Sequence, residues 1–192
     1  NGPRWSSKGA ATGVPLNYLA QFSPALRENM RGDLALGGEW GLDLQAASVA
    51  GGTPQLAGMV HVFRERGDLI MGADVPVVLG LRVLDLRADV AGNALRTRLN
   101  VDGTRAGVAQ VDATAQLVNG RIGNASPLRL SANADMASIA WMAPLTGQPG
   151  LELDGAMKVA LTGGGTIGAP TLNGAINGGN LAVRWPEQGV KL

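Results

Sequence analysis

Apolar and polar residues alternate with a period of two along most of this chain. The clearest example is the segment 151–161, where Leu151, Leu153, Met157, Val159 and Leu161 are separated mainly by charged or small residues. Such alternation is typical of a strand with one apolar and one polar face. Similar patterns recur within residues 34–44, 60–62, 77–90, 95–101, 111–117, 128–130 and 172–183. The chain therefore predicts a series of strands.

Turn signals separate these strands at intervals of about ten to fifteen residues, with no helix of crossover length between most of them. Gly92-Asn93, Asp102-Gly103 and Asn119-Gly120 are predicted turns, and the charged run 64–68 is predicted as a solvated turn. The glycine run within 162–166 is expected to interrupt the strand that precedes it. These connections favour an antiparallel meander.

One change of phase interrupts the alternation. Val77, Leu79, Leu81 and Val83 follow one phase, whereas Leu84, Leu86, Ala88 and Val90 follow the other. A strand cannot move its apolar set by one residue without a bulge or bend. We therefore expect a bulge near Val83 and Leu84.

Two short helices are expected beside the strands. Residues 1–13 are rich in Gly and Ser and are predicted to be a flexible lead-in. A helical segment then begins at Pro15 and ends at Gly32. The second helix begins at Asp135 as its N-cap, because Met136, Ile139, Ala140 and Ala143 have helical spacing, and it stops at Pro144.

The landmarks around these helices recur in the same order and predict an internal repeat. Pro24 corresponds to Pro144 and Gly32 to Gly155, while the motif Pro-x-Leu-x-Gly occurs at 54–58 and at 170–174. The expected organisation is a first module of helix and β-meander over residues 14–134, and a truncated second module over 135–192. The second module would continue the sheet of the first.

Composition narrows the functional classes. The chain has 192 residues, 45% of them apolar, with only 4% aromatic. Its Leu, Val and Ala side chains are suited to lining a surface, and few bulky residues are present to fill a thick core. A net charge of +1 argues against a nucleic-acid binder, and the absence of cysteine excludes disulfides, cysteine-based metal sites and thiol catalysis. We expect no cofactor and no metal.

Candidate catalytic features have simpler interpretations. His61 is the sole histidine and lies between two valines, so it is predicted to be a polar-face strand residue. Gly163-Gly164-Gly165 lacks the Lys-Ser/Thr of a phosphate loop. Two charged pairs, Glu152 with Asp154 and Arg96 with Arg98, are expected to lie on solvated strand faces. The alternative for the arginines is contact with anionic headgroups. Met136, Trp141 and Met142 are expected to cap a sheet edge, with a mobile lid as the alternative.

Two non-enzymatic classes fit the pattern. In the first, a curved or folded sheet has an open apolar groove that shields acyl chains or unfolded β-strands. In the second, a closed sandwich, a small barrel or a solenoid stalk buries the same residues. The predicted groove lining consists of Leu34, Leu36, Val60, Val62, Leu79, Leu81, Leu84, Leu86, Leu99, Val101, Leu117, Leu128, Leu130, Leu151, Leu153, Met157, Val159, Leu161, Leu172, Ile176, Leu181 and Val183.

The order of helix, strand, glycine break and Gly-x-Pro-x-Leu-x-Gly resembles the TamB family of Gram-negative bacteria, which is related to AsmA-like proteins. The resemblance covers residues 14–192 and is carried mainly by 168–174, by 185–192 and by the stretch from Gly37-Gly38-Glu39-Trp40 to Gly67-Asp68-Leu69. It implies a β-taco, which is an antiparallel sheet folded lengthwise into an apolar groove.

The resemblance also implies a place and partners. Members of the family are periplasmic, anchored in the inner membrane and linked at their far end to TamA, an outer-membrane barrel. They are implicated in phospholipid movement between membranes and in outer-membrane protein assembly. The chain is therefore predicted to be a non-catalytic periplasmic segment that binds phospholipid or another acyl-chain lipid, with the TamA contact lying outside it.

Overall fold

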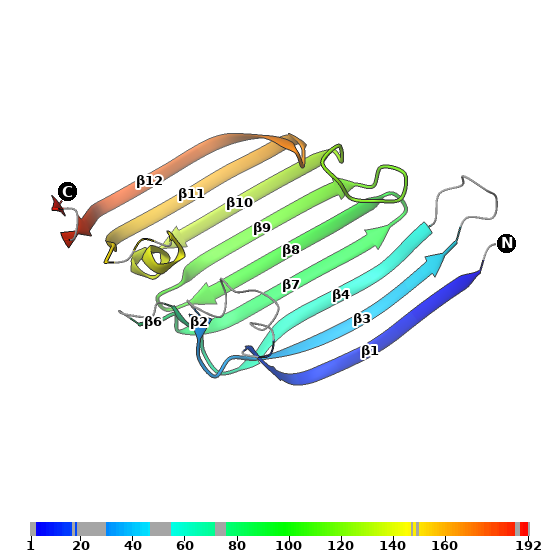
Figure 1. The fold of residues 1–192 in the computed structure, drawn as a ribbon, viewed down its shortest axis with the longest axis horizontal. Coiled ribbons are helices and arrows are strands. Elements are labelled where there is room, and N and C mark those ends of the chain that lie inside the picture. The colour runs from blue at the N-terminus through cyan, green and yellow to red at the C-terminus, as the bar shows by residue number, and fades with distance from the viewer. Residues whose placement is uncertain are drawn as a thin grey trace.

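The computed structural model describes residues 3–16, 18, 30–46, 55–71, 76–146, 148, 150–186 and 189–191. One large antiparallel sheet dominates it (Figure 1). The strands of this sheet, in spatial order, are β1 (Arg4–Pro15), β3 (Ala35–Gln45), β4 (Gln55–Arg66), β7 (Leu81–Ala91), β8 (Ala94–Gly103), β9 (Gly107–Gln116), β10 (Leu128–Met136), β11 (Glu152–Thr166), β12 (Ala169–Trp185) and β13 (Val190–Lys191). The predicted all-β antiparallel meander is confirmed.

The strands of the large sheet follow one another in chain order. Three short strands lie outside it and form a separate sheet: β2 (Met30–Arg31), between β1 and β3 in sequence, and β5 (Ile70–Met71) and β6 (Val77–Val78), between β4 and β7. A 3-10 helix, η1 (Ala140–Thr146), connects β10 to β11. Each strand of the large sheet pairs antiparallel with its neighbours, and its two edge strands, β1 and β13, do not pair with each other.

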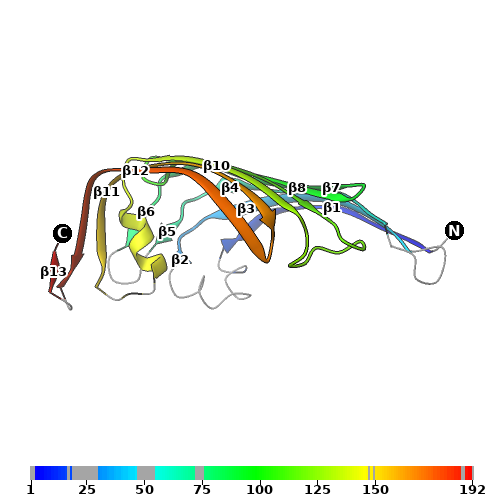
Figure 2. The ribbon, with the colours of Figure 1, turned by 90° about the horizontal axis from the view of Figure 1, so that it is seen from above.

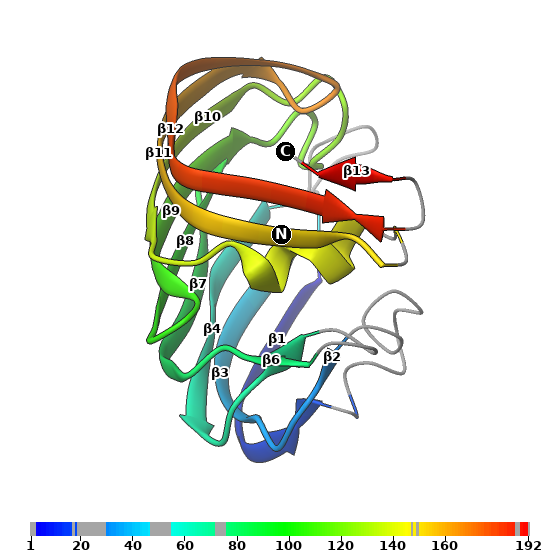
Figure 3. The ribbon, with the colours of Figure 1, turned by 90° about the vertical axis from the view of Figure 1, so that its left-hand side faces the viewer.

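The large sheet is curved and open. Figure 2 shows that the sheet is bent, so that one of its faces is concave, and that η1, β5 and β6 lie on the concave side towards one end. Figure 3 shows the sheet curving from β12 to β1, with η1 on the inside of the curve. This arrangement leaves the rest of the concave side without a second layer of described strands.

The buried core lies where the small sheet and η1 meet the concave side. Leu34 is the most buried large side chain, with 1% of its surface exposed. It belongs to a cluster whose other members are Leu16, Leu36, Leu69, Met71, Leu79, Leu81 and Ala106. Val62, Leu84, Val101 and Trp141 pack against the cluster. The largest buried cluster therefore lies at one end of the groove, while Ala94, Ala115 and Leu117 are buried towards the opposite end of the strands.

The last glycines of the two Pro-x-Leu-x-Gly motifs share a backbone geometry. Gly58 in β4 has φ +141°, and Gly174 in β12 has φ +145°. A Cβ on Gly58 would meet the carbonyl oxygen of Gly41 in β3, and a Cβ on Gly174 would meet that of Ala160 in β11. The pair β3–β4 is thus matched by β11–β12, with the Leu-x-Gly of each motif at the same place.

Three sequence predictions about local structure are wrong. Most of the expected flexible lead-in is the long edge strand β1, which pairs with β3 from Arg4 to Pro15. The run Gly163-Gly164-Gly165 does not interrupt its strand, because β11 continues to Thr166, pairing with β12 throughout the run and with β10 as far as Gly163. Met136 does not begin a helix, because it ends β10 opposite Met157.

Other local predictions fit more closely. The turns at Gly92-Asn93 and Asn119-Gly120 are present, and the register of β7 shifts between Leu81 and Val83, beside the expected bulge. The turn predicted within 64–68 begins later, because β4 extends to Arg66. The first predicted helix falls mostly outside the described residues, as do Pro24 and Pro54.

We predict that Gly174→Ala will lower the free energy of unfolding by roughly 1–3 kcal/mol, because an L side chain is strained at this φ and meets the neighbouring strand. Gly58→Ala should behave alike. Gly179→Ala is the matched control, since a Cβ there has nothing within 4 Å. Urea unfolding of the three variants measures the difference, and equal stability of all three would contradict the proposed equivalence.

Candidate functional site

The register of the central strands separates apolar from polar side chains. In β7 and β8, Leu86 lies opposite Leu99, and Leu84 lies opposite Val101. The residues that alternate with them form polar pairs, such as Asp85 with Asn100 and Arg87 with Arg98. Directly opposed residues of an antiparallel pair point to the same face of the sheet. One face of this hairpin is therefore apolar and the other charged.

The same assignment continues across every long strand. From β1 at one edge to β12 at the other, the pairings place apolar or small residues opposite one another. The exception is Arg64 at the end of β4, which lies opposite Leu36. We call the set of apolar and small residues the apolar face. From β7 to β12 its members are Leu84, Leu86, Ala88, Val90, Leu95, Thr97, Leu99, Val101, Ala109, Val111, Ala113, Ala115, Leu128, Leu130, Ala132, Ala134, Met136, Met157, Val159, Leu161, Gly163, Leu172, Gly174, Ile176 and Gly178.

The apolar face is the concave one. Leu36, Val62, Leu84 and Val101 on this face belong to or pack on the core cluster beneath η1 and the small sheet. Those elements lie on the concave side in Figure 2. In β9 and β10 the face is built mainly of alanine, so its middle carries little side-chain volume.

Most of the predicted lining residues lie on the apolar face. They are Leu36, Val60, Val62, Leu84, Leu86, Leu99, Val101, Leu128, Leu130, Leu153, Met157, Val159, Leu161, Leu172, Ile176 and Val183. Leu181 lies beside Gly178 in β12, and Leu151 is half-buried just before β11. Register shifts in β7 and β11 keep this set together.

Five predicted lining residues do not offer an open surface. Leu34, Leu36, Leu79, Leu81 and Leu117 are buried, each with less than a tenth of its surface exposed. Leu34 and Leu79 precede strands and Leu117 follows β9, so they pack within the chain. The alternation that singled them out is equally compatible with a core position, which is why sequence could not separate the two roles.

Sequence reasoning missed the contribution of β1 and the far halves of β3 and β4. Trp5 lies opposite Leu44, and Leu44 lies opposite Leu56, on the apolar face. The alternation of Leu42 and Leu44 was a usable signal. The signal in β1 was weak, because Ser7, Gly9 and Ala11 occupy its inward positions.

Much of the apolar face is accessible to solvent. Leu86 and Val60 are each 37% exposed, and Leu172 and Ile176 are each 61% exposed. Along the described chain, no second sheet covers these side chains. In the part of the chain that the structure describes, the apolar face is therefore a groove in which the core cluster fills one end and side chains such as Leu86, Leu172 and Ile176 stay open to solvent.

The filled end contains an unpaired polar atom. Trp141 in η1 packs on the core cluster, and its indole Nε1 is buried with no hydrogen-bond acceptor. Met136, which the sequence analysis placed in the same cap as Trp141, is instead a buried residue at the end of β10. Ile139 and Ala143, on either side of Trp141 in the sequence, are also buried. Trp141 thus contributes to closing this end of the groove.

The convex face carries ion pairs between neighbouring strands. Arg98 Nε lies 2.6 Å from Asp112 Oδ1, and Arg82 pairs with Asp102. Hydrogen bonding and the negative charge of each partner raise the pKa of both arginines above their ordinary value. These exposed ion pairs make the convex face polar and solvated, which is the environment that the sequence predicted for Arg98.

His61 belongs to this polar face. Its Nε2 lies 2.6 Å from Asp85 Oδ2, and its ring centroid is 4.9 Å from that of Phe63. The register places Glu39 and Arg87 on either side of it. The surroundings are those of a strand residue in an ion-pair network, consistent with the predicted polar-face position.

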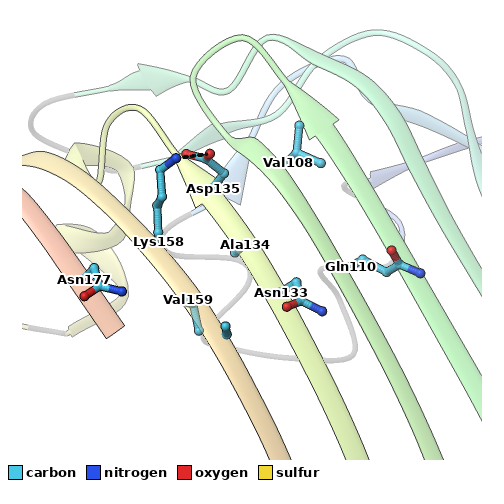
Figure 4. Close-up of a pocket in the computed structure, with 9 residues that line it drawn as sticks. Val108, Gln110, Asn133, Ala134, Asp135, Lys158, Val159 and Asn177 are labelled. Atoms are coloured by element: carbon cyan, nitrogen blue, oxygen red, sulfur yellow. Dashed lines mark ion pairs between the residues drawn. The ribbon is translucent and has the colours of Figure 1, made fainter. Parts of the chain in front are cut away.

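A shallow depression of about 470 Å³ also lies over β9 to β12 (Figure 4). Its polar lining comes from Gln110, Asn133 and Asn177 and from the pair formed by Lys158 Nζ and Asp135 Oδ2, 2.9 Å apart. The two charged side chains are mostly exposed. The depression therefore lacks a buried acid, base or nucleophile.

Comparisons with known proteins leave the family open. No family model, curated protein or solved structure matches this chain. The resemblance to TamB stays a prediction. Among the described residues no His, Asp or Glu cluster is suited to hold a metal ion, and none of the described helices has the length and apolar character needed to cross a membrane.

We predict that nitroxide labels at Leu99→Cys and Arg98→Cys will differ in their accessibility to a water-soluble relaxation agent. The label at position 99 should be the more shielded, because Leu99 is half-buried on the concave face, whereas the Arg98 side chain is 61% exposed. Equal accessibility would contradict the face assignment. The chain has no native cysteine, so each label is unique.

Proposed function

We propose that the apolar face binds the acyl chains of lipids and shields them from water, without catalysis. The observation that carries this proposal is that no charged side chain occurs on this face from β7 to β12. Leu86, Leu172 and Ile176 are nevertheless substantially exposed. A contiguous exposed apolar surface of this kind favours association with another apolar molecule.

Burial of hydrocarbon supplies the driving force for such binding. Each methylene group transferred from water to an apolar surface contributes about 0.8 kcal/mol. Along the curve of the sheet, the eight spacings between nine strands span roughly 38 Å at about 4.8 Å each. The groove therefore offers an extended path along which a chain can remain in contact with apolar side chains.

The chemistry of the face favours acyl chains over unfolded polypeptide. A polypeptide lying on the concave face would bring peptide N–H and C=O groups against leucine, valine and alanine, and unpaired buried peptide groups are costly. An acyl chain has no such groups. The exposed fractions of Val60 and Ile176 also count against a closed sandwich that buries the whole face.

Transport of phospholipid between the two membranes of a cell envelope is the larger role that we propose. An open groove lets a lipid keep its headgroup in water while its chains move along the apolar face. The periplasmic location, the inner-membrane anchor and the association with TamA in outer-membrane protein assembly follow from the resemblance to the TamB family alone.

The first test compares adjacent residues on opposite faces of β12. We predict that Ile176→Asp will weaken binding of a fluorescent fatty acid by about tenfold or more, because its carboxylate would lie in the path of the chain. Asn177→Asp is the matched control, since Asn177 lies on the convex side and its substitution should leave binding unchanged. Fluorescence titration measures both, and equal affinities would argue against the groove.

The second test separates an open groove from a closed core. Val159→Asp and Leu181→Asp should each lower the free energy of unfolding by only about 1 kcal/mol, because a charge in an open groove remains hydrated. A closed core would lose several kcal/mol. Thermal unfolding measures the difference. The same variants should still fail in an outer-membrane integrity assay when placed in the full-length protein, and full activity would remove the groove from the mechanism.

Cargo can also be identified directly. We predict that organic extracts of the purified protein will contain phospholipid or free fatty acid, detected by mass spectrometry. The amount should fall in Ile176→Asp and remain unchanged in Asn177→Asp. Extracts free of lipid from both the unmodified protein and the control variant would contradict the proposal.

A further inference from the structure

One side chain in the long central part of the apolar face carries a hydroxyl group. From β7 to β12 the members of this face are Leu, Val, Ile, Met, Ala and Gly, with the single exception of Thr97 in β8. The register places Thr97 opposite Ala88 in β7 and opposite Ala113 in β9. Directly opposed residues share a face, so the Thr97 side chain lies in the groove.

The protein does not use this hydroxyl itself. Thr97 is half-buried, and along the described chain its Oγ1 has no hydrogen-bond partner. By contrast, the polar side chains of Trp40 in β3 and Ser7 in β1 satisfy each other, because Trp40 Nε1 donates to Ser7 Oγ at 3.1 Å. Thr97 therefore provides the one side-chain hydrogen-bond donor on the apolar face from β7 to β12, and that donor is available to a ligand.

The place of Thr97 in the groove distinguishes it from other strand threonines, which are common. Ala88, Thr97 and Ala113 form a row of short side chains across β7, β8 and β9. The neighbouring rows hold larger side chains, which are Leu86, Leu99 and Val111 on one side and Val90 and Leu95 on the other. The short row is therefore a trough that runs across the strands, along the path of a chain bound in the groove.

A single hydroxyl in hydrocarbon surroundings suits a neutral acceptor. Threonine donates one hydrogen bond, and one donor does not replace the hydration that an ionised carboxylate loses on an apolar surface. An ester carbonyl is uncharged, so its desolvation costs less and a single donor satisfies it. The chemistry of Thr97 therefore favours an esterified acyl chain over a free fatty acid.

We propose that Thr97 donates a hydrogen bond to an ester carbonyl of the bound lipid and thereby determines where the polar end of the acyl chain lies. This inference rests on the proposed binding of acyl chains and narrows it to esterified lipid, such as phospholipid. Thr97 is a specificity residue of the groove. The remaining contacts of the lipid are with hydrocarbon side chains.

The direction of the acyl chain follows from the same row of residues. The row continues from Thr97 through Ala113, Leu130 and Gly163 to Leu172 in β12, and Leu172 is 61% exposed. The four strand spacings from β8 to β12 cover about 19 Å at about 4.8 Å each. The hydrocarbon part of the lipid therefore lies between β8 and β12, with its ester group at β8.

The test compares two fluorescent probes with the same chain, the methyl ester of a fatty acid and a hydrocarbon of equal length. Thr97→Val removes the hydroxyl and keeps a β-branched side chain of nearly the same shape. It should weaken binding of the ester about threefold to tenfold and leave binding of the hydrocarbon unchanged in fluorescence titration. An unchanged ratio of the two affinities would overturn the role of Thr97.

Two further variants serve as controls. Thr97→Ser keeps the hydroxyl and should restore the preference for the ester. Thr114→Val makes the same substitution in the neighbouring strand on the convex face, where Thr114 lies opposite Arg96, and it should alter neither affinity. A Thr97→Ser protein without the preference, or a Thr114→Val protein that loses it, would overturn the proposal.

The ionised fatty acid with the same chain separates the two sources of an acyl group. Its carboxylate remains in water, so Thr97→Val should leave its affinity unchanged. An equal loss of affinity for the acid and for the ester would overturn the assignment to esterified lipid.

Infrared spectroscopy of the bound ester gives a signature that is independent of affinity. A hydrogen bond lowers the stretching frequency of a carbonyl, so the band of an isotope-labelled ester should lie lower in the unmodified protein and in Thr97→Ser than in Thr97→Val. The same band in all three would overturn the proposal. Failure of every probe to bind the unmodified protein would overturn the groove itself, which distinguishes that outcome from a failure of Thr97 alone.

Discussion

The physical constraint on which this structure depends is the period of two in side-chain direction, maintained in register across nine antiparallel strands. A slip of one residue in any pairing would move a row of leucine, valine and alanine to the convex face and a row of charges into the groove. The bulge between Leu81 and Val83 and the irregularity near Gly155 show how the chain preserves this order. Each restores the apolar set to the concave face after the strand changes phase.

The separation of faces explains the uneven distribution of the core. Among the described residues, η1 and the small sheet form a second layer at one end of the groove, and there Leu34, Met71 and Leu79 are almost fully buried. Elsewhere the sheet is held by its backbone ladders and by ion pairs on the convex side, such as Arg98 with Asp112. Stability and the proposed binding of acyl chains thus depend on different regions of the same apolar face.

The sequence predicted the face assignment better than it predicted the elements at the edges. Leu99 and Arg98 lie on opposite faces as expected, since strict alternation leaves a strand no other arrangement once one face is apolar. The strand β1 was missed because Ser, Gly and Ala carry little hydrophobic signal. Its conformation is determined by pairing with β3, a contact between residues far apart in the chain.

The glycine run in β11 failed as a predictor for a related reason. Gly163 to Gly165 have turn-forming freedom by themselves, and Gly165 has φ +85°, but the ladder with β12 continues through all three and that with β10 reaches Gly163. Burial was equally ambiguous, because Leu79 and Leu86 have similar patterns although one is buried and the other open. Whether a second layer covers a given leucine depends on tertiary contacts that alternation does not encode.

The alanines of β9 and β10 set the depth of the groove. Ala109, Ala113, Ala132 and Ala134 line its middle and are partly exposed to solvent. Groove capacity can therefore change during evolution without alteration of the backbone. Replacement of one alanine by valine or leucine would narrow the passage, and relatives that differ only at these positions could select ligands of different thickness while keeping the same sheet.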